Sequence, residues 1–582
     1  MKMTGAQIIV KLLEMQGITQ AAGIPGGSIL PLYDELSRSS IHHILVRQEQ
    51  AAGFIAQGMA RSTGKPAVCF ATSGPGAMNL LTAIADARSD SIPVIAITGQ
   101  VNTSMICTDA FQEADTFGLS FPITKHSIMV KSPRELLAAI PEAFAIAVSG
   151  RSGPVLIDVP RDVQTAVCDV SAKDFSAGTS YVQPVRFRTQ ISDYPVLFRK
   201  FAAALLAAKK PVLYIGGGCS TPAAAGSIRQ FLSIYMAPVV SSLMGIGIVP
   251  CTDERYAGMV GMHGSYAANK AMHDSDLVLA AGARFDDRAV GLVSAFCPHA
   301  KILHIDIDAA EVNKIYPADL AFVADVESIL PVLTQTLKEA EQNDTKVSDS
   351  GAAGLRGSWC HKIADIRKKE FSVTEGAVSK SSMPNPRAFI AAVPSLAQKA
   401  GLAADDIIVT TDVGQHQMWT AQYYPFTRPR SFLTSGSLGT MGFGLPAAIG
   451  ASLANPGRRV VCISGDGSIM MNIQELATLS ELNLPVTVIV LQNGTLGMVR
   501  QQQKYLFNKN YSASEFIHRP DFLAIAEGFG IEAIEANNDS TWYEKAFTKE
   551  GPQPRFVLLC IDPEEDVLPY VEPGQANIDA VQ

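Results

Sequence analysis

The sequence predicts an α/β protein made of three blocks, each a doubly wound parallel sheet. Short apolar, β-branched runs alternate with amphipathic stretches of about ten to fifteen residues, which is typical of parallel strands joined by crossover helices. The length of 582 residues has room for several domains. A composition of 47% hydrophobic and 18% charged residues supplies large buried cores and excludes a disordered protein.

Charge and hydropathy exclude two kinds of partner. The 47 basic and 55 acidic residues give a formal net charge of −8, and no Lys/Arg-rich run is present, so we expect no nucleic-acid binding. No uninterrupted run of about 18 apolar residues occurs, so we expect no membrane span. The amino terminus enters a helical pattern directly, without a signal or transit segment, which predicts a cytoplasmic chain. The nine scattered cysteines predict reduced thiols and no zinc site.

The three blocks are separated by changes in composition. The first is expected over residues 1–175, the second over 190–340 and the third over 381–565, with a polar, Gly/Ser/Pro-rich linker at 341–380 and a tail at 566–582. The runs predicted as strands are 41–46, 66–71, 93–98, 155–158, 211–216, 277–281, 301–305, 407–411, 459–463, 485–491 and 555–561.

A repeated pattern relates the first and third blocks. In each, a strand leads into a Gly-rich turn, a helix and a second strand that begins with proline. Gly76 precedes Pro93 by 17 positions, and Gly467 precedes Pro485 by 18. The two outer blocks are therefore predicted to be copies of one α/β unit, with an acidic turn residue in the second copy alone.

An acidic turn follows one predicted strand of the third block, and an asparagine follows the next. These are Gly465-Asp466-Gly467 and Asn493, with Asp466 and Asn493 27 positions apart. Because the carboxyl ends of parallel strands open on one edge of a sheet, we expect the two side chains to meet. A carboxylate, an amide oxygen and the carbonyl near Thr495 suit Mg²⁺, and the glycines let an anion approach. An isolated Gly-Asp-Gly is more often a tight turn, but its place at a strand end favours a metal site.

This arrangement resembles the metal and diphosphate motif of the thiamine diphosphate (ThDP) enzymes. The outer blocks then resemble that family's pyrimidine-binding and diphosphate-binding domains around a central domain, over essentially the whole chain. Met441 matches the bulky residue that bends the cofactor, although a buried Met before a Gly-rich helix start is otherwise plain core. The resemblance implies metal ligation by Asp466, Asn493 and Thr495, and ThDP binding by Val413, Gly414, Gln415, His416, Gly439, Met441, Gly465, Gly467, Ser468, Leu496, Gly497 and Met498.

Glu49 matches the family's catalytic acid. ThDP enzymes need a carboxylic acid beside the aminopyrimidine ring, and a carboxyl group in an apolar pocket can exchange a proton near neutrality. Glu49 follows the strand 41–46 and opens a helix; without the resemblance it reads as a dipole-favoured surface residue. Its surroundings resemble the family's Arg-His-Glu-Gln, with Gln48 in place of His, which puts only a neighbouring hydrogen bond in doubt.

The middle block resembles the FAD-binding domain of the acetolactate synthase (acetohydroxyacid synthase) family. The Arg-Phe-Asp-Asp-Arg run at 284–288 is the most specific feature, since strand-end glycines alone are weak signals. The resemblance implies FAD binding by Gly216, Gly217, Gly218, Leu243, Met244, Gly261, Met262, His263, Arg284, Asp286, Arg288 and Asp306. The implied reaction transfers no net electrons, so the flavin would be structural or vestigial.

The resemblance also implies substrates and the residues that meet them. A 2-ketoacid carries a carboxylate, for which a guanidinium is suited, and we expect Arg288 in that role. Outside the family context, a surface salt bridge within Asp286-Asp287-Arg288 is the better interpretation. Lys125 is expected at the entrance, with Gln112 and Gly26 near the reacting centre. Gln502 stands where most biosynthetic members have Trp, which resembles bacterial isozyme I and predicts weaker preference for 2-ketobutyrate.

The resulting hypothesis is an acetolactate synthase reaction in branched-chain amino acid biosynthesis. Pyruvate is decarboxylated on ThDP, and the hydroxyethyl carbanion adds to pyruvate or 2-ketobutyrate. The resemblance implies a homodimer or tetramer, with the cofactor between two chains, and a separate small regulatory subunit. Three alternatives stay open: a flavin-dependent pyruvate oxidase, a non-catalytic regulatory relative, and a nicotinamide dehydrogenase, against which the absence of a Gly-x-Gly-x-x-Gly helix start speaks.

Overall fold

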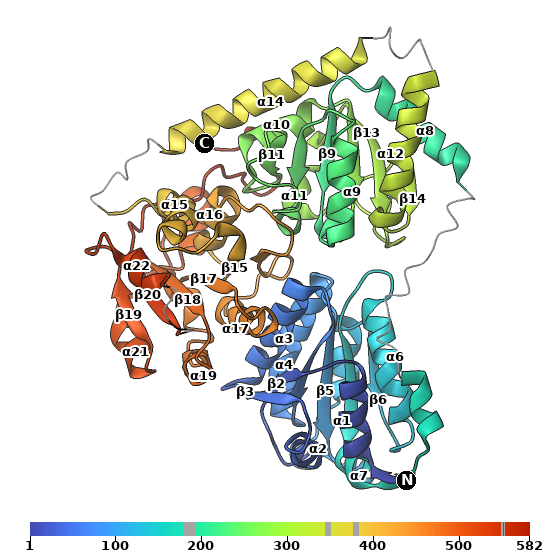
Figure 1. The fold of residues 1–582 in the computed structure, drawn as a ribbon. Coiled ribbons are helices and arrows are strands. Elements are labelled where there is room, and N and C mark those ends of the chain that lie inside the picture. The colour runs from blue at the N-terminus through green and yellow to red at the C-terminus, as the bar shows by residue number, and fades with distance from the viewer. Residues whose placement is uncertain (179–193, 344–350, 376–382, 549–550, 552, 582) are drawn as a thin grey trace.

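Three six-stranded parallel sheets, each flanked by helices, form the chain (Figure 1). The computed structural model describes residues 1–178, 194–343, 351–375, 383–548, 551 and 553–581. The predicted α/β class with three parallel-sheet domains is thereby confirmed. None of the described helices has the length and apolarity needed to cross a membrane.

The amino-terminal sheet has the strand order β3-β2-β4-β5-β7-β6. Its central strands are buried throughout, which explains why they read as continuous apolar runs. The strands are β2 (Gln20–Gly23), β3 (His42–Leu45), β4 (Ala67–Ala71), β5 (Val94–Gln100), β6 (His126–Met129) and β7 (Val155–Pro160). The helices are α1 (Gly5–Met15), α2 (Leu30–Leu36), α3 (Glu49–Thr63), α4 (Pro75–Ser89), α5 (Thr116–Ser120), α6 (Leu136–Val148) and α7 (Arg161–Thr165); β1 (Lys2–Thr4) pairs antiparallel with β8 (Val167–Asp169).

The central sheet has the order β11-β10-β9-β12-β13-β14, which is the Rossmann order 3-2-1-4-5-6. Its strands are β9 (Pro211–Ile215), β10 (Val239–Ser241), β11 (Tyr256–Met259), β12 (Leu277–Ala281), β13 (Lys301–Asp306) and β14 (Leu320–Val323). Its helices are α8 (Pro195–Ala207), α9 (Pro222–Leu232), α10 (Tyr266–Asp274), α11 (Asp287–Val290) and α12 (Val326–Asn343).

The carboxy-terminal sheet has the order β16-β15-β17-β18-β20-β19, which repeats the topology of the amino-terminal sheet strand for strand. The repeat predicted from the sequence is therefore present in the fold. The strands are β15 (Ile407–Thr411), β16 (Phe432–Leu433), β17 (Arg459–Gly465), β18 (Val486–Gln492), β19 (Glu532–Glu535) and β20 (Arg555–Cys560). The helices are α15 (Pro386–Lys399), α16 (Gln415–Tyr423), α17 (Gly444–Ala454), α18 (Asp466–Ile469), α19 (Glu475–Glu481), α20 (Gly497–Leu506), α21 (Phe522–Gly528) and α22 (Trp542–Ala546).

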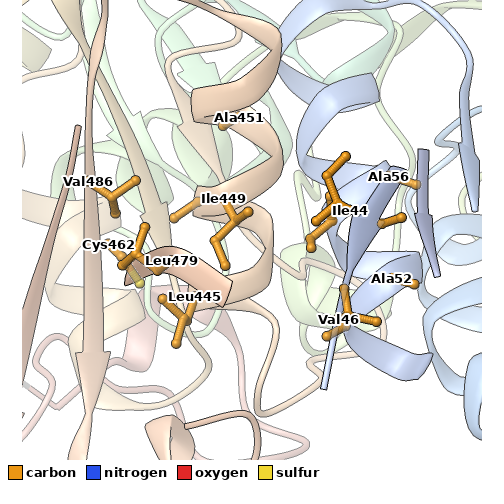
Figure 2. Close-up of a cluster of buried hydrophobic side chains, with 14 of the residues drawn as sticks. Ile44, Val46, Ala52, Ala56, Leu445, Ile449, Ala451, Cys462, Leu479 and Val486 are labelled. Carbon is orange, nitrogen blue, oxygen red and sulfur yellow. The ribbon is translucent and has the colours of Figure 1, made fainter. Parts of the chain in front are cut away.

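One hydrophobic core crosses the boundary between the two outer domains. Figure 2 shows Ala52 and Ala56 of α3 in one buried cluster with Leu445 and Ile449 of α17. The two helices touch because glycines face backbone: a Cβ on Gly450 would stand 2.0 Å from a carbonyl oxygen of α3. The two outer domains of one chain therefore share a continuous hydrophobic core.

The predicted linker is wrong for residues 352–375, which form the helix α14 (Ala352–Glu375). Trp359 and Ile363 of this helix lie buried in the core of the central domain, and the Trp359 indole N–H donates to the carbonyl of Pro211 at 3.1 Å. The segment has a polar composition because one face of the helix is exposed, while a few apolar side chains anchor the other. Residues 341–343 of the predicted linker end the helix α12, and its residues 344–350 and 376–380 lie outside the described residues.

Candidate functional site

A cavity of about 840 Å³ lies where the three domains meet. All of the residues predicted to bind ThDP and the metal line it. The residues predicted to bind FAD line it too, except Gly216 and Gly261. The residues predicted to bind ThDP and those predicted to bind FAD are more than a hundred positions apart in the sequence, but they line the same cavity.

Asp466 and Asn493 meet at the carboxyl edge of the third sheet. Asp466 follows β17, Asn493 follows β18, and the Gly494 N–H donates to Asp466 Oδ2 at 2.7 Å. Burial raises the pKa of Asp466 to about 6, while the backbone N–H groups of Gly494 and Gly467 and the charge of Arg519 act in the opposite direction. None of the ion pairs in the described part of the chain includes Asp466. A buried carboxylate without a direct ion pair among the described residues is costly, so this position suits a bound metal ion. The donor set of Asp466, Asn493 and Thr495 consists of the hard oxygen ligands that Mg²⁺ takes.

His416 lines the cavity and has a ring nitrogen without a hydrogen-bond partner among the described residues. Its ring is buried, Nε2 has no hydrogen-bond partner, and burial lowers the pKa of the imidazole to about 3, so the ring is neutral. The ring is seated between glycines: a Cβ on Gly465 would stand 2.8 Å from His416 Nδ1, and one on Gly414 2.8 Å from Cε1. A buried polar atom of this kind is available to a ligand in the cavity.

Glycines also bring the loops after β17 and β18 against the other walls. A Cβ on Gly497 would stand 2.0 Å from Gln415 Oε1, and one on Gly467 2.8 Å from Leu496 Cδ2. Gln415 accepts a hydrogen bond from Asn493 Nδ2 at 3.1 Å, which fixes the amide beside the acidic turn. A Cβ at either position would displace the end of a side chain, so the glycines leave room for the side chains that form this wall.

The central part of the cavity lies at the switch point of the Rossmann-ordered sheet. Strands β9 and β12 are neighbours where the strand order reverses, and nucleotide ligands of open α/β sheets bind at such points. The glycine loop after β9 packs on the loop after β12, since a Cβ on Gly218 would lie 2.8 Å from Gly282 Cα. Burial raises the pKa of Asp306, at the end of β13, to about 6.

The two arginines of the 284–288 run have different surroundings. Arg284 Nη2 donates to Ser437 Oγ at 2.7 Å, which joins the central domain to the third. Arg288 lines the cavity with a side chain that is 67% exposed, and its Nε lies 3.6 Å from Asp287 Oδ2. A loosely paired, accessible guanidinium at the cavity mouth can still turn towards a carboxylate.

Glu49, Gln112 and Gly26 gather around the turn after β4 rather than in the cavity. Glu49 begins α3, and Asn79 Nδ2 donates to its Oε2 at 3.0 Å. A Cβ on Gly76 would lie 3.3 Å from Glu49 Oε1, and one on Gly74 2.7 Å from the carbonyl oxygen of Gln112. The Cβ position of Gly26 lies 2.6 Å from the Thr72 side chain in the same turn. None of the three residues lines the cavity of its own chain.

Lys125 lies away from this group as well. Its amino group donates to the carbonyls of Ile146 at 2.5 Å and Ser149 at 2.6 Å, at the end of α6. Burial lowers the pKa of Lys125 to about 8. The amine caps the carboxyl end of a helix, where a positive charge is favourable. The predicted place of Lys125 at the site entrance finds no support within one chain.

Several residues that line the cavity gave no recognisable signal in the sequence. Arg61, Asp90 and Arg151 come from the first domain, and Arg151 Nη1 lies 2.8 Å from Glu311 Oε1 of the second. A single Arg or Asp in a helix or loop has no local pattern that predicts such a long-range partner. Gln502, singled out in the sequence, does line the cavity.

Comparisons with known proteins agree with this geometry. Three models of the thiamine pyrophosphate enzyme family match: the N-terminal TPP binding domain at residues 3–119, the central domain at 198–333 and the C-terminal TPP binding domain at 412–560. The chain is 48% identical to the acetolactate synthase isozyme 1 large subunit of Escherichia coli, over 100% of this chain and 98% of that protein. It is 42% identical to the isozyme 2 large subunit of the same organism over 100% of both chains. It is 40% identical to a probable acetolactate synthase large subunit of Methanocaldococcus jannaschii, over 100% of this chain and 95% of that protein.

Proposed function

This chain belongs to the thiamine pyrophosphate enzyme family, and on that premise we propose that it is the catalytic large subunit of an acetolactate synthase. Pyruvate loses CO₂, and its remaining two-carbon unit joins a second 2-ketoacid. The product is 2-acetolactate when pyruvate accepts and 2-aceto-2-hydroxybutyrate when 2-ketobutyrate accepts. The observation that carries the proposal is the buried carboxylate of Asp466 beside Asn493, which has no ion pair among the described residues and lies in a cavity shared with a Rossmann-ordered sheet.

The third domain would hold ThDP and Mg²⁺. Asp466, Asn493 and Thr495 supply oxygen ligands for the metal, and the unpartnered His416 nitrogen and the glycine-shaped wall face the remaining space. Bound ThDP supplies a carbon that can carry the negative charge left by decarboxylation. The protein's own contribution is to fix that group and to exclude water around it.

The central domain would hold FAD. The switch point between β9 and β12, the touching glycine loops and Asp306 at a strand end are what a dinucleotide needs. The reaction has no net electron transfer, so we assign the flavin a structural role.

A second copy of the chain would complete the site. Glu49 and Gln112 lie outside the cavity of their own chain, which supports a role at the cofactor of a partner. Next to Gln112, Phe111 is 86% exposed, and Phe121 is 68% exposed. Large apolar side chains that stand free in one chain mark a surface that a partner covers. In a homodimer or tetramer, the Glu49 carboxyl would hold a proton against the partner's aminopyrimidine ring.

Substrate binding would involve both exposed and cavity-lining groups. Arg288 would bind the 2-ketoacid carboxylate at the cavity mouth, and Gln502 would form part of the wall beside the acceptor. A glutamine gives less apolar contact than a tryptophan, so we expect modest preference for 2-ketobutyrate. A small regulatory subunit and a place in the cytoplasm complete the proposal.

Product analysis tests the proposal and separates it from its alternatives. The purified chain, loaded with ThDP, Mg²⁺ and FAD, is incubated with pyruvate while CO₂, oxygen and products are measured. Acetolactate formed without oxygen uptake supports the proposal. Acetate with peroxide would show a pyruvate oxidase instead, and no CO₂ release at all would show a non-catalytic relative.

A further inference from the structure

The segment 435–440 reaches the cavity without regular secondary structure. It connects β16 to α17 and ends beside Met441, and Gly436, Ser437, Gly439 and Met441 all line the cavity. An irregular segment has no ladder or helix to hold its backbone amides, so its shape depends on the partners those amides find.

Those partners belong to the first domain. The N–H groups of Gly436 and Ser437 donate to the two oxygens of Asp90 at 2.8 and 2.9 Å. The hydroxyl groups of Ser435 and Thr440 donate to Asp86 Oδ2, that of Thr440 at 3.0 Å. The segment 435–440 therefore donates four hydrogen bonds to the carboxylates of Asp86 and Asp90, which lie about 350 positions earlier in the chain.

Burial of these two carboxylates at a helix end is energetically unfavourable. Asp86 and Asp90 lie one turn apart at the carboxyl end of α4, where the helix dipole disfavours negative charge, and both side chains are 0% exposed. Arg61 of α3 bridges them, with Nη2 3.0 Å from Asp86 and 2.9 Å from Asp90. One guanidinium faces two carboxylates, so helix stability and ion pairing alone do not account for the second acid.

We propose that Asp86 and Asp90 are positioning residues that hold the segment 435–440, so that the first domain of a chain shapes the thiamine site of that same chain. The proposal rests on the proposed function, since it takes Gly439 and Met441 to contact the cofactor. The first domain then has two separate tasks. Glu49 serves the partner's site, and the Asp86–Asp90 pair serves its own.

A binding cycle tests this proposal. Asp86→Asn, Thr440→Val and the double variant are titrated with ThDP in the presence of Mg²⁺, and the quenching of tryptophan fluorescence is followed, since Trp419 lines the cavity. A hydrogen bond to a charged group typically changes an equilibrium by about tenfold or more, so each single variant should raise the Kd of ThDP about tenfold. Both changes remove the Thr440–Asp86 hydrogen bond, and Asp86→Asn also weakens the contacts of Asp86 with Ser435 and Arg61. The double variant should therefore bind ThDP about as weakly as Asp86→Asn alone.

Controls separate positioning from a general loss of fold. Asp34→Asn, at an exposed carboxylate on α2 of the same domain, should bind ThDP like the parent. Thr440→Ser, which keeps the hydroxyl group, should also bind ThDP like the parent. If Asp86→Asn does not fold, the comparison of Thr440→Ser with Thr440→Val tests the inference instead. Single variants within twofold of the parent, or a double variant that multiplies the two effects, would overturn the inference alone. A parent chain that binds no ThDP would overturn the proposed function and this inference together.

Discussion

Replacing Gly450 by Ala should separate the two outer domains of the chain. The added Cβ would stand 2.0 Å from the carbonyl oxygen of Ile55, whereas an ordinary contact needs at least 3.4 Å. The obstacle is backbone on both sides, so no side chain can swing away, and α3 and α17 must move apart by more than about 1 Å. The contact is reciprocal, because a Cβ on Gly58 would stand 2.1 Å from the carbonyl oxygen of Ala447.

The cost follows from the core that these helices share. Overpacking of a well-filled core costs about 1–3 kcal/mol. Here the displacement also opens the apolar contacts drawn in Figure 2, so we expect the upper end, about 3 kcal/mol. Greater helix propensity of Ala returns less than about 1 kcal/mol. The double variant with Gly58→Ala should lose less than the sum, since one separation relieves both clashes.

Urea unfolding followed by tryptophan fluorescence measures the effect. The matched control is Gly226→Ala, a glycine within α9 whose added Cβ would meet nothing within 4 Å. The control should be neutral or stabilised by about 0.5–1 kcal/mol. If Gly450→Ala unfolds at the same urea concentration as the control, the helices do not approach as closely as described, and the reasoning is refuted.

Three further outcomes are expected. Glu49→Gln should abolish CO₂ release from pyruvate while the Kd of ThDP stays within a few fold; substantial turnover in this variant contradicts the proton-holding role. Gln502→Trp should raise the preference for 2-ketobutyrate over pyruvate by about 5- to 160-fold, from about 1–3 kcal/mol of apolar contact, measured by product competition; an unchanged ratio removes Gln502 from the acceptor wall. Burial raises the pKa of Asp158 to about 7 from 3.8, so the folded state binds the extra proton and stability falls as pH rises through this range. Asp158→Asn should cancel about 4 kcal/mol of that fall between pH 4 and 7, and parallel pH profiles of unfolding free energy would exclude the effect.

Local patterns in the sequence were enough to predict the strands that are buried on both faces of a sheet. The strands Leu277–Ala281 and Ile407–Thr411 were predicted with the bounds observed, because a strand covered on both faces must be apolar throughout. The short strands β2 and β10 were missed, since three or four residues carry no period. The helix α14 was taken for a linker because its buried apolar anchors, such as Trp359 and Ile363, are isolated in a polar run.

By itself the sequence determined the fold class, the repeat of the outer units, and the pairing of Asp466 with Asn493, because each depends on residues near strand ends of one α/β unit. Only the tertiary structure decided which groups line the cavity. Glu49 and Gln112 do not line it, and Lys125 binds carbonyl groups at the end of α6. Asp86 and Asp90 accept hydrogen bonds from the segment 435–440. The physical reason is that hydrogen bonds and burial depend on distance in space. No pattern along the chain encodes a contact between a helix of one domain and a loop about 350 positions later.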